Sequence, residues 1–446
     1  MTVSAILLVA AVELGLGGEP KAQVASARIG SWRTWLPKSA ESGGGVLDAF
    51  GVTGPFAAQS PAIKRWREPH TSLRWTRTAL ELIAKHQLNP LRAARILALL
   101  HAAMHDALVR GVREGGDERQ AWIAVHRAAS LVLADLFTQE PAERFEALGL
   151  AAAEAVRGAE EPGAAAMWAI GREVAADAGA RARADSAERV WPVNRRPPPA
   201  PGRWRPTPPV NVFNPLEPLA GEWQPWVLAS GGEIEPPEPV PYDSPRYADE
   251  VREVKRVADA LTPLQKAVAE AWNLDRGTVT PAGVWSLKTI ELAEEPQVDG
   301  ATAVRVLAAL SVAMADAFVA CWHAKYEWWT VRPISVIRER HDPGFLSHLV
   351  TPAFPSYPSG HATASGAAEV VLAAFFPKKA EWLRGQAEEA AASRLLGGIH
   401  FRSDNEAGLE LGRAVGRRVV ERVLGARPPL QGATSADVRG PNPVAQ

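Results

Sequence analysis

The residues of this chain that are best suited to chemistry lie in its last third, in three short stretches. The stretches are Lys325-Tyr-Glu-Trp-Trp-Thr-Val-Arg332-Pro333, then Pro358-Ser359-Gly360-His361, then Ser393-Arg394 followed by His400 and Asp404. They supply three cations, a hydroxyl group, a glycine amide and two imidazoles. This set does not resemble a Ser-His-Asp triad or a zinc or calcium site. It contains the groups that hold a tetrahedral oxyanion tightly while that anion is attacked.

Lys325 and Arg332 are seven positions apart. Because seven positions make two turns of a helix, a helix would present both cations on one face. Pro333 is compatible with a turn or a helix end at this point. Taken alone, such a pair is more often a solvated helix face.

The Pro358-Ser359-Gly360-His361 stretch precedes an apolar run that stops at Pro377, which predicts a buried helix beginning near Ser359. The start of such a helix offers free N–H groups to an anion, and Gly360 lets the backbone approach that anion closely. Ordinary capping by Ser359 explains the Ser-Gly pair equally well when the pair is considered alone.

Arg394 adds a planar guanidinium that suits two hydrogen bonds to one oxyanion. The glycine pair at 397–398 is expected to end its helix and so to free His400. Asp404 then lies where it can accept a hydrogen bond from the His400 ring and fix the tautomer. A His and an Asp at this spacing are also common as a surface pair. The conjunction of three patterns within 80 residues, all serving one anion, carries the argument.

Together, Lys-x6-Arg-Pro, Pro-Ser-Gly-His and Ser-Arg-x5-His-x3-Asp resemble the signature of the superfamily of type-2 phosphatidic acid phosphatases (PAP2) and vanadium haloperoxidases. All three match over residues 325–404, and a weaker resemblance runs from Thr71 to Gly425. The flanks, with Trp322 before the lysine and Phe354 before the Pro-Ser-Gly-His stretch, are similar to those of vanadium-dependent chloroperoxidases and their bacterial relatives. The Pro-rich middle, at 202–209 and 243–247, resembles the same branch.

The resemblance to the haloperoxidases implies a vanadate cofactor and a set of residues that hold it: Lys325, Arg332, Ser359, Gly360 and Arg394. It implies that His400 ligates vanadium, and that hydrogen peroxide oxidises halide to hypohalous acid. In this interpretation His361 transfers a proton and Lys325 polarises the bound peroxide.

The same resemblance implies supporting roles for three further residues. Asp404 would hold His400 in place, and Trp322 and Phe354 would line the pocket.

The phosphatase branch is the alternative, because vanadate mimics phosphate and its transition state. A phosphoester would then occupy the same cradle, His400 would form a phosphohistidine, and His361 would protonate the leaving alcohol. The flanks and the lack of membrane spans favour the haloperoxidase. A non-catalytic oxyanion-binding or scaffold protein is a third class, but simple binding would not require both imidazoles and Asp404.

Composition indicates an ordinary globular protein. The chain has 446 residues, of which 47% are hydrophobic and 22% charged, and its formal net charge is −1. With this charge balance the protein has no net positive electrostatic field that would attract nucleic acid. The single cysteine, Cys321, rules out an intramolecular disulfide, so cysteine usage does not indicate an oxidising compartment.

Residues 1–27 have some features of a signal peptide, namely an apolar core at 5–12 and a cleavage triplet at 25–27. No positive charge precedes the core, and Glu13 interrupts it. Export would make the protein periplasmic or secreted, and otherwise it would be cytoplasmic. No run reaches about 18 apolar residues, so no transmembrane segment is expected.

Two similar segments, 94–107 and 304–317, lie 210 residues apart and share eight of fourteen residues. They suggest two related helical units. The apolar periodicity predicts helices at 91–109, 120–137, 141–158, 163–184, 244–260, 262–273 and 285–294. His101, His105 and Asp106 resemble a metal set, but the second copy has Ser311 and Ala315 at the histidine positions. We therefore interpret the three residues as core and exclude them from the site.

The predicted architecture is all-α, with two four-helix-bundle-like halves. The expected segments are a loosely packed lead-in (28–70), a first half (71–188), a Pro/Trp-rich connection (189–245), a second half with the whole site (246–426) and a flexible tail (427–446). Trp204, Trp223 and Trp226 are expected to lie on the helical body, because they are too apolar for a free linker. The sequence leaves the oligomeric state open, a homodimer included.

Overall fold

The computed structural model describes residues 19–38, 72–157 and 163–425. The predicted tail at 427–446 and most of the predicted signal peptide and lead-in lie outside these residues.

The described residues are helical, as the Ala- and Leu-rich composition predicts. The helices before the connection are α2 (Glu19–Gly30), α4 (Leu73–Lys85), α5 (Pro90–Arg113), α6 (Glu118–Leu136), α7 (Ala142–Arg157) and α8 (Ala164–Ala184). Those after it are α9 (Pro245–Asp259), α10 (Pro263–Ala271), α11 (Thr280–Ala293), α12 (Gly300–Trp328), α13 (Pro333–Arg340), α14 (Gly360–Phe375), α15 (Ala380–Leu396) and α16 (Arg402–Leu424). In the described ranges, β-structure is limited to one isolated bridge, between Arg203 and Thr330. The predicted all-α fold is confirmed, and each predicted helix is present with ends shifted by a few residues.

Short polar residues fix the starts of the two central helices. The side chain of Asn89 accepts hydrogen bonds from the amides of Leu91 and Arg92 at the start of α5, where Pro90 occupies the first turn. At the start of α12, Asp299 accepts from the amide of Thr302. Both caps satisfy amides that have no partner inside their helix.

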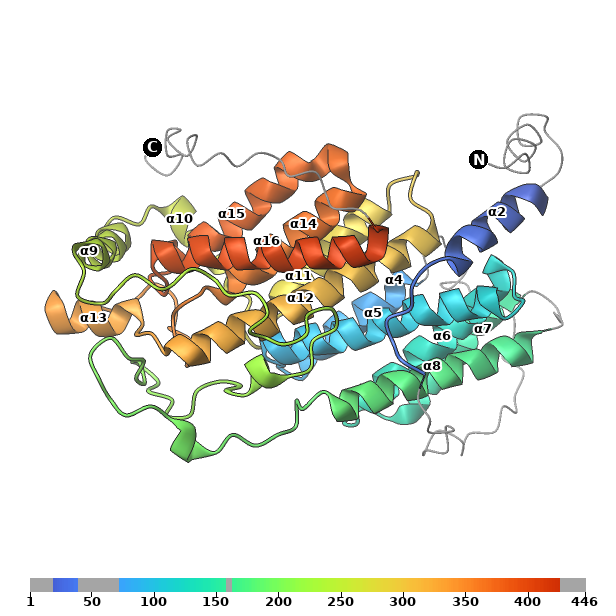
Figure 1. Ribbon diagram of the computed structural model, residues 1–446, viewed down its shortest axis with the longest axis horizontal. Helices are drawn as coiled ribbons and strands as arrows, with labels where there is room; N and C mark the ends of the chain where they lie inside the picture. Colours follow the sequence, from blue (N-terminus) through green and yellow to red (C-terminus); the bar gives the residue numbers. More distant parts are fainter. Residues whose placement is uncertain (1–18, 39–71, 158–162, 426–446) are drawn as a thin grey trace.

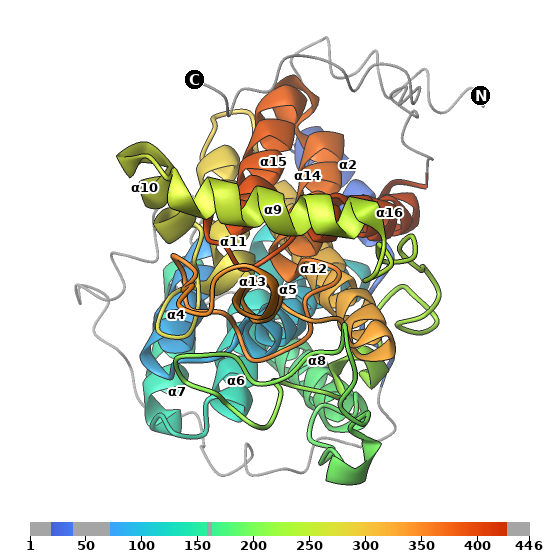
Figure 2. The same ribbon diagram turned by 90° about the vertical axis from the view of Figure 1, so that its left-hand side faces the viewer.

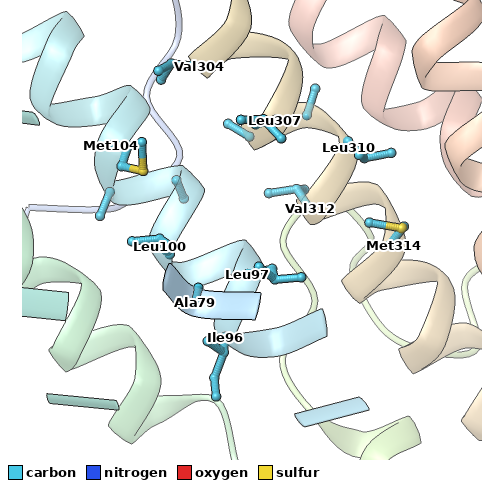
Figure 3. Packing of buried hydrophobic residues seen from close by; sticks show 14 of the residues in the cluster. Ala79, Ile96, Leu97, Leu100, Met104, Val304, Leu307, Leu310, Val312 and Met314 are labelled. Atoms are coloured by element: carbon cyan, nitrogen blue, oxygen red, sulfur yellow. The ribbon is translucent and has the colours of Figure 1, made fainter. Parts of the chain in front are cut away.

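Helices α5 and α12 pack against each other at the centre of the core (Figure 1). Figure 3 shows side chains of both helices in one apolar cluster, with Leu97 and Leu100 on α5 and Leu307 and Leu310 on α12. Helix α12 is long and apolar enough to cross a membrane, but 94% of its apolar window is buried inside the body. Burial of such a window is typical of the core helix of a globular protein.

The two similar sequence segments form the middles of α5 and α12. His101 and Ser311, which occupy the same position in the two copies, are joined by a hydrogen bond of 2.7 Å between Nδ1 and Oγ. Because equal positions contact each other, an approximate two-fold axis relates the two copies. Around this axis α6 packs on α5, α7 and α8, and α14 packs on α12, α15 and α16 (Figures 1 and 2).

A stripe of glycines on α16, at 408, 412 and 416, lets this helix lie directly on α14. A Cβ atom at Gly412 would be 1.9 Å from the carbonyl oxygen of Thr363. A Cβ atom at Gly408 would be 2.6 Å from the carbonyl oxygen of Ser359. This close approach brings the start of α16 to the start of α14, where the amide of Ser359 donates to the carbonyl of Asp404 at 2.8 Å.

The lead-in is better packed than predicted in its described part. Ile29, Trp32 and Leu36 are buried in the main core. The amides of Trp35 and Leu36 donate to the buried carboxylate of Asp106 at 2.7–3.0 Å. The prediction of loose packing is therefore wrong for residues 28–38, because their tryptophans fill the core rather than being scattered on a flexible segment.

The Pro/Trp-rich connection lies on the helical body, as predicted for its tryptophans. Trp204 and Trp223 are buried, and Trp226 packs against the main core. The connection also pairs with the loops that follow α12 and α13. The amide of Trp204 donates to the carbonyl of Trp329, and that of Leu216 donates to Ala353, both at 2.8 Å.

Candidate active site

Lys325 and Arg332 belong to different elements, so the prediction that one helix presents both is wrong. Helix α12 ends at Trp328, and Trp329 caps it with the left-handed φ of 51°. Arg332 has an extended backbone, with φ −83° and ψ 152°, and directly precedes α13. Pro333 explains this conformation, because proline disfavours a helical residue before it.

Lys325 lies in the last turn of α12 with its ammonium group completely buried. Nζ donates to the backbone carbonyls of Pro355 at 3.0 Å, of Ser356 at 2.7 Å and of Pro358. Burial, reinforced by the charge of Arg332, lowers the pKa of Lys325 to about 7. The lysine therefore fixes the loop in front of α14 through its backbone.

Arg332 is also completely buried. Its Nε donates to the carbonyl of Phe354 at 2.8 Å, and Nη1 donates to the carbonyl of Ile399 at 2.7 Å. Nη1 lies 3.0 Å from Nε2 of His400 as well, while Nη2 has no hydrogen-bond partner. Burial lowers the pKa of Arg332 to about 9.

His400 has the tautomer that its neighbours impose. Arg332 has only N–H groups to offer, so Nε2 of His400 must accept. The ring proton then lies on Nδ1, which donates to Oδ2 of Asp404 at 2.9 Å, as the sequence spacing predicts. Burial, followed by the charges of Arg332 and Lys325, holds the pKa of His400 well below its ordinary value. The imidazole is neutral and presents a lone pair on Nε2.

Asp404 is held by more than its histidine. Besides the His400 bond, Oδ2 accepts from the hydroxyl of Ser356 at 2.6 Å and from the amide of Phe401 at 3.1 Å. Burial raises the pKa of Asp404, and the hydrogen bond from Ser356 and the charge of Lys325 oppose the rise. Sequence reasoning missed Ser356, because its partner lies 48 residues further along the chain and no local pattern links them.

Ser359 and Gly360 begin α14. Ser359 is the N-cap residue, yet its side chain makes no capping hydrogen bond, and the buried Oγ has no partner. Ordinary capping thus does not explain this serine. A Cβ atom at Gly360 would lie 3.1 Å from Cζ3 of Trp322, so the glycine makes room for the indole.

His361 lies in the first turn of α14, with no hydrogen-bond partner for Nε2. Burial, followed by the charge of Arg394, holds its pKa well below the ordinary value. Hydrogen bonding to the backbone of Asn273 and Trp272, just beyond α10, opposes this shift. The imidazole is therefore neutral and has one free ring nitrogen.

Arg394 lies in the last turn of α15, which ends at the predicted glycine pair. Its Nε donates to Oγ of Ser393 at 2.9 Å, and Nη2 donates to the carbonyl of Ala269 at 3.1 Å. Burial, followed by the charge of Arg332, lowers its pKa to about 9.

These residues come from α12, α14, α15 and α16 and from the segments just before α13 and α16, but they lie within electrostatic reach of one another. The charges of Arg332, Lys325 and Arg394, in this order, lower the pKa of His400, and His361 adds to them. Three buried cations therefore surround two neutral imidazoles. The elements that carry them meet at the end of the body where α9 and α13 lie, which faces the reader in Figure 2.

Comparisons with known proteins bear on the fold that carries this site. A family model described as "VCPO second helical-bundle domain" matches residues 305–382 and 376–427. The chain is 27% identical to a bacterial vanadium-dependent iodoperoxidase of known structure, with a TM-score of 0.67 over 80% of this chain and 96% of that one. Over this domain and in its fold, the chain is similar to the vanadium haloperoxidases of the haloperoxidase/PAP2-like superfamily.

Two further structures share the fold of this chain. An apo-type bacterial vanadium-dependent chloroperoxidase is 17% identical, with a TM-score of 0.60 over 76% of this chain and 95% of that one. The holo-type bacterial chloroperoxidase is 16% identical, with a TM-score of 0.59 over 83% of this chain and 95% of that one. No curated protein sequence matches this chain.

Trp322 and Phe354 lie beside the cations of the candidate site. Their ring centroids are 5.0 Å apart. Nζ of Lys325 lies 5.3 Å from the Phe354 ring, and the guanidinium carbon of Arg332 lies 4.7 Å from it. The two aromatic side chains form an apolar wall that lowers the local dielectric constant, so electrostatic interactions between the charged groups of the site are stronger.

The histidines excluded from the site have structural partners. His101 is bonded to Thr76 and Ser311, and its burial lowers its pKa to about 3. His105 is bonded to Asp106 and stacks on Trp32. Their interpretation as core is confirmed, and the described residues contain no group of three or more potential metal ligands.

Proposed function

We propose that this protein is a vanadate-dependent haloperoxidase that uses hydrogen peroxide to oxidise halide to hypohalous acid. The observation that carries the proposal is a set of buried polar atoms that have no hydrogen-bond partner. They are Nη2 of Arg332, Oγ of Ser359 and Nε2 of His361. Buried polar groups without partners are uncommon in folded proteins, and three of those in the described residues belong to this one candidate site.

The charges of the site fit an oxyanion. Lys325, Arg332 and Arg394 are each at most 1% exposed, and the one carboxylate bonded within the site is Asp404. Buried cations without counter-ions are costly, and a bound oxyanion offsets that cost. Vanadate carries the required charge and offers oxygens to guanidinium, hydroxyl and amide donors.

Each residue then has a role that follows from its contacts. Arg332, Arg394, Ser359 and the amide of Gly360 would hold the oxygens of vanadate. His400 would ligate the metal through Nε2, the nitrogen that its bond to Asp404 leaves unprotonated. When bound, vanadate supplies a Lewis-acidic centre that activates hydrogen peroxide towards halide.

The other two polar groups act on protons and charge. His361 is neutral with Nε2 free, so it can accept a proton from hydrogen peroxide. Lys325 combines a fixed position with a pKa of about 7, so a small change in its surroundings shifts it between the neutral and the charged form. Its charged form would stabilise negative charge that develops on oxygen.

The experiment starts with protein purified in the presence of vanadate. Metal analysis should find about one vanadium per chain, and the loaded protein should consume peroxide only when bromide or iodide is added. His400→Ala should lose both vanadium and turnover. His361→Ala should keep more of its vanadium than of its turnover. His341→Ala, which removes an exposed histidine, is the matched control and should change neither.

The predicted alternative, a phosphatase acting through a phosphohistidine, gives the opposite pattern. Vanadate-free protein would hydrolyse an activated phosphoester rapidly, and vanadate would only inhibit it. The comparisons do not favour this outcome, and finding it would reject the haloperoxidase proposal.

A further inference from the structure

Two segments outside the candidate site share the pattern Trp-x2-Trp and bind the core in the same way. We call Trp32–Leu36 the first strap and Trp223–Leu228 the second strap. In the first, the carboxylate of Asp106 accepts from the amides of Trp35 and Leu36. In the second, Asp316 accepts from the amides of Trp226 at 2.7 Å and Val227 at 2.8 Å. Asp106 and Asp316 are equivalent positions of the two similar segments.

An arginine from the last helix of the opposite half covers each strap. Arg422 of α16 lies 5.0 Å from the ring of Trp35 and donates to the carbonyl of Thr34 at 3.0 Å. Arg181 of α8 lies 3.8 Å from the ring of Trp226 and donates to the carbonyl of Pro225 at 3.0 Å. The approximate two-fold axis therefore relates both straps together with their surroundings.

Arg95 and Arg305 are a second pair of arginines at equivalent positions of the two similar segments. Nη2 of Arg95 donates to the carbonyl of Ala182 at 2.7 Å, and Nη2 of Arg305 donates to that of Val423 at 2.6 Å. Beyond this bond the two sites differ. Nε of Arg95 forms an ion pair of 2.6 Å with Asp185. Within the described ranges, no carboxylate pairs with Arg305.

The sequence explains the difference. The displacement that relates Arg181 to Arg422 and Ala182 to Val423 relates Asp185 to Ala426. Alanine has no carboxylate, and in the part of the chain that the structure describes the first-strap site has the arginines of its counterpart without that counter-ion.

A small cavity lies at the first strap, lined among others by Trp32, Trp35, His105, Arg305 and Arg422. Its volume is about 10 Å³, which is the room for one water-sized occupant. The guanidinium carbon of Arg305 lies 4.5 Å from the ring of Trp32, so the stacking holds the charge in place. No carboxylate of the described residues is among those that line this cavity.

We propose that this cavity, the Arg305 site, binds a small monovalent anion, either a halide ion or the carboxylate of a small acid. The anion would take the place beside Arg305 that the carboxylate of Asp185 takes beside Arg95. It would lie between α12 and α16 and stabilise the contact of the first strap with both helices. This site is independent of the vanadate pocket and of the proposed activity.

The test compares thermal unfolding of vanadate-loaded protein in rising sodium bromide and in rising sodium acetate. At an anion concentration tenfold above the dissociation constant, the melting temperature of the wild type should rise by about 1–2 °C through binding. Arg305→Met should lose this rise, and general salt effects cancel because the same series is run on both proteins. Arg276→Met, which removes an exposed arginine, should behave as the wild type. Equal rises in the wild type and Arg305→Met would overturn the proposal.

A second variant and a crystal locate the site, and they keep the test valid where Arg305→Met does not fold. Asp185→Asn removes the built-in counter-ion from Arg95, so this variant should gain a further bromide-dependent stabilisation that the wild type lacks. An anomalous signal from bromide should appear beside Arg305 in the wild type and beside Arg95 as well in Asp185→Asn. A signal in the crystal without any stabilisation in solution would mean an adventitious ion only. No signal beside Arg305, or no gain in Asp185→Asn, would also overturn the proposal.

Discussion

Replacing Asp404 tests whether this carboxylate sets the chemistry of His400. Oδ2 accepts three hydrogen bonds, from the ring of His400 at 2.9 Å, the hydroxyl of Ser356 at 2.6 Å and the amide of Phe401 at 3.1 Å. Asp404→Ala leaves all three buried donors without an acceptor. At about 1–3 kcal/mol for each of the three, the free energy of unfolding should fall by about 3–9 kcal/mol. Asp404→Asn keeps an acceptor oxygen and the volume, and should lower that free energy by about 1–2 kcal/mol.

The two anions should respond to Asp404→Asn in opposite directions. Vanadate affinity should fall about tenfold, because a neutral acceptor makes His400 a weaker ligand. Phosphate competes for the same cations without a metal–nitrogen bond. Its affinity should therefore stay equal or increase, because one negative charge leaves the neighbourhood of three cations.

The assay titrates vanadate into vanadate-free protein and follows bromide-dependent peroxide consumption, with and without phosphate. Urea unfolding of the same samples measures the free energy of unfolding. A parallel loss of vanadate and phosphate affinity would refute the reasoning, because it would mean that Asp404 only supports the shape of the site. Unchanged vanadate affinity in Asp404→Asn would refute it as well.

Three further predictions follow from individual contacts. Ser356→Ala removes one of the hydrogen bonds to Asp404 and should weaken vanadate binding about three- to fivefold in the same titration. The control is Ser365→Ala, which removes the acceptor of Trp285 Nε1. It should lower the stability of the protein but leave vanadate affinity unchanged. Burial lowers the pKa of Lys325 to about 7. Above that pH the unfolded chain therefore binds more protons than the folded one. The free energy of unfolding of the vanadate-free protein should then rise by at most about 1.4 kcal/mol per pH unit between about pH 7 and 10. Lys325→Met should remove this rise in urea unfolding at pH 7 and 9, and an identical slope in both proteins would contradict the shift. Gly412→Ala places Cβ 1.9 Å from a backbone oxygen and should destabilise the protein by about 3 kcal/mol or more. Gly385→Ala, whose Cβ meets no atom within 4 Å, should instead stabilise it by about 0.5–1 kcal/mol. Equal effects of the two variants on the melting temperature would show that α16 does not depend on its close approach to α14.

The sequence by itself singled out the candidate residues of the site and the helices that carry most of them. Helix periodicity and capping are local, so the bounds of α5 and α14 follow from a few neighbouring residues. The bond from His400 to Asp404 spans one helical turn and was predictable for the same reason. The superfamily was also predictable, because its three motifs are short and occur in a fixed order.

Only the tertiary structure decided how these residues meet. Pro333 separates Arg332 from the helix of Lys325, and only the structure shows that the charges of both still act on the imidazole of His400. Ser356 reaches Asp404 across 48 positions, and the first strap fills the core beside Asp106 although its local sequence predicted loose packing. Such contacts depend on which surfaces are buried together, and burial is a property of the whole fold. The same reason explains why the lack of a carboxylate partner for Arg305 among the described residues becomes visible only beside its paired counterpart, Arg95.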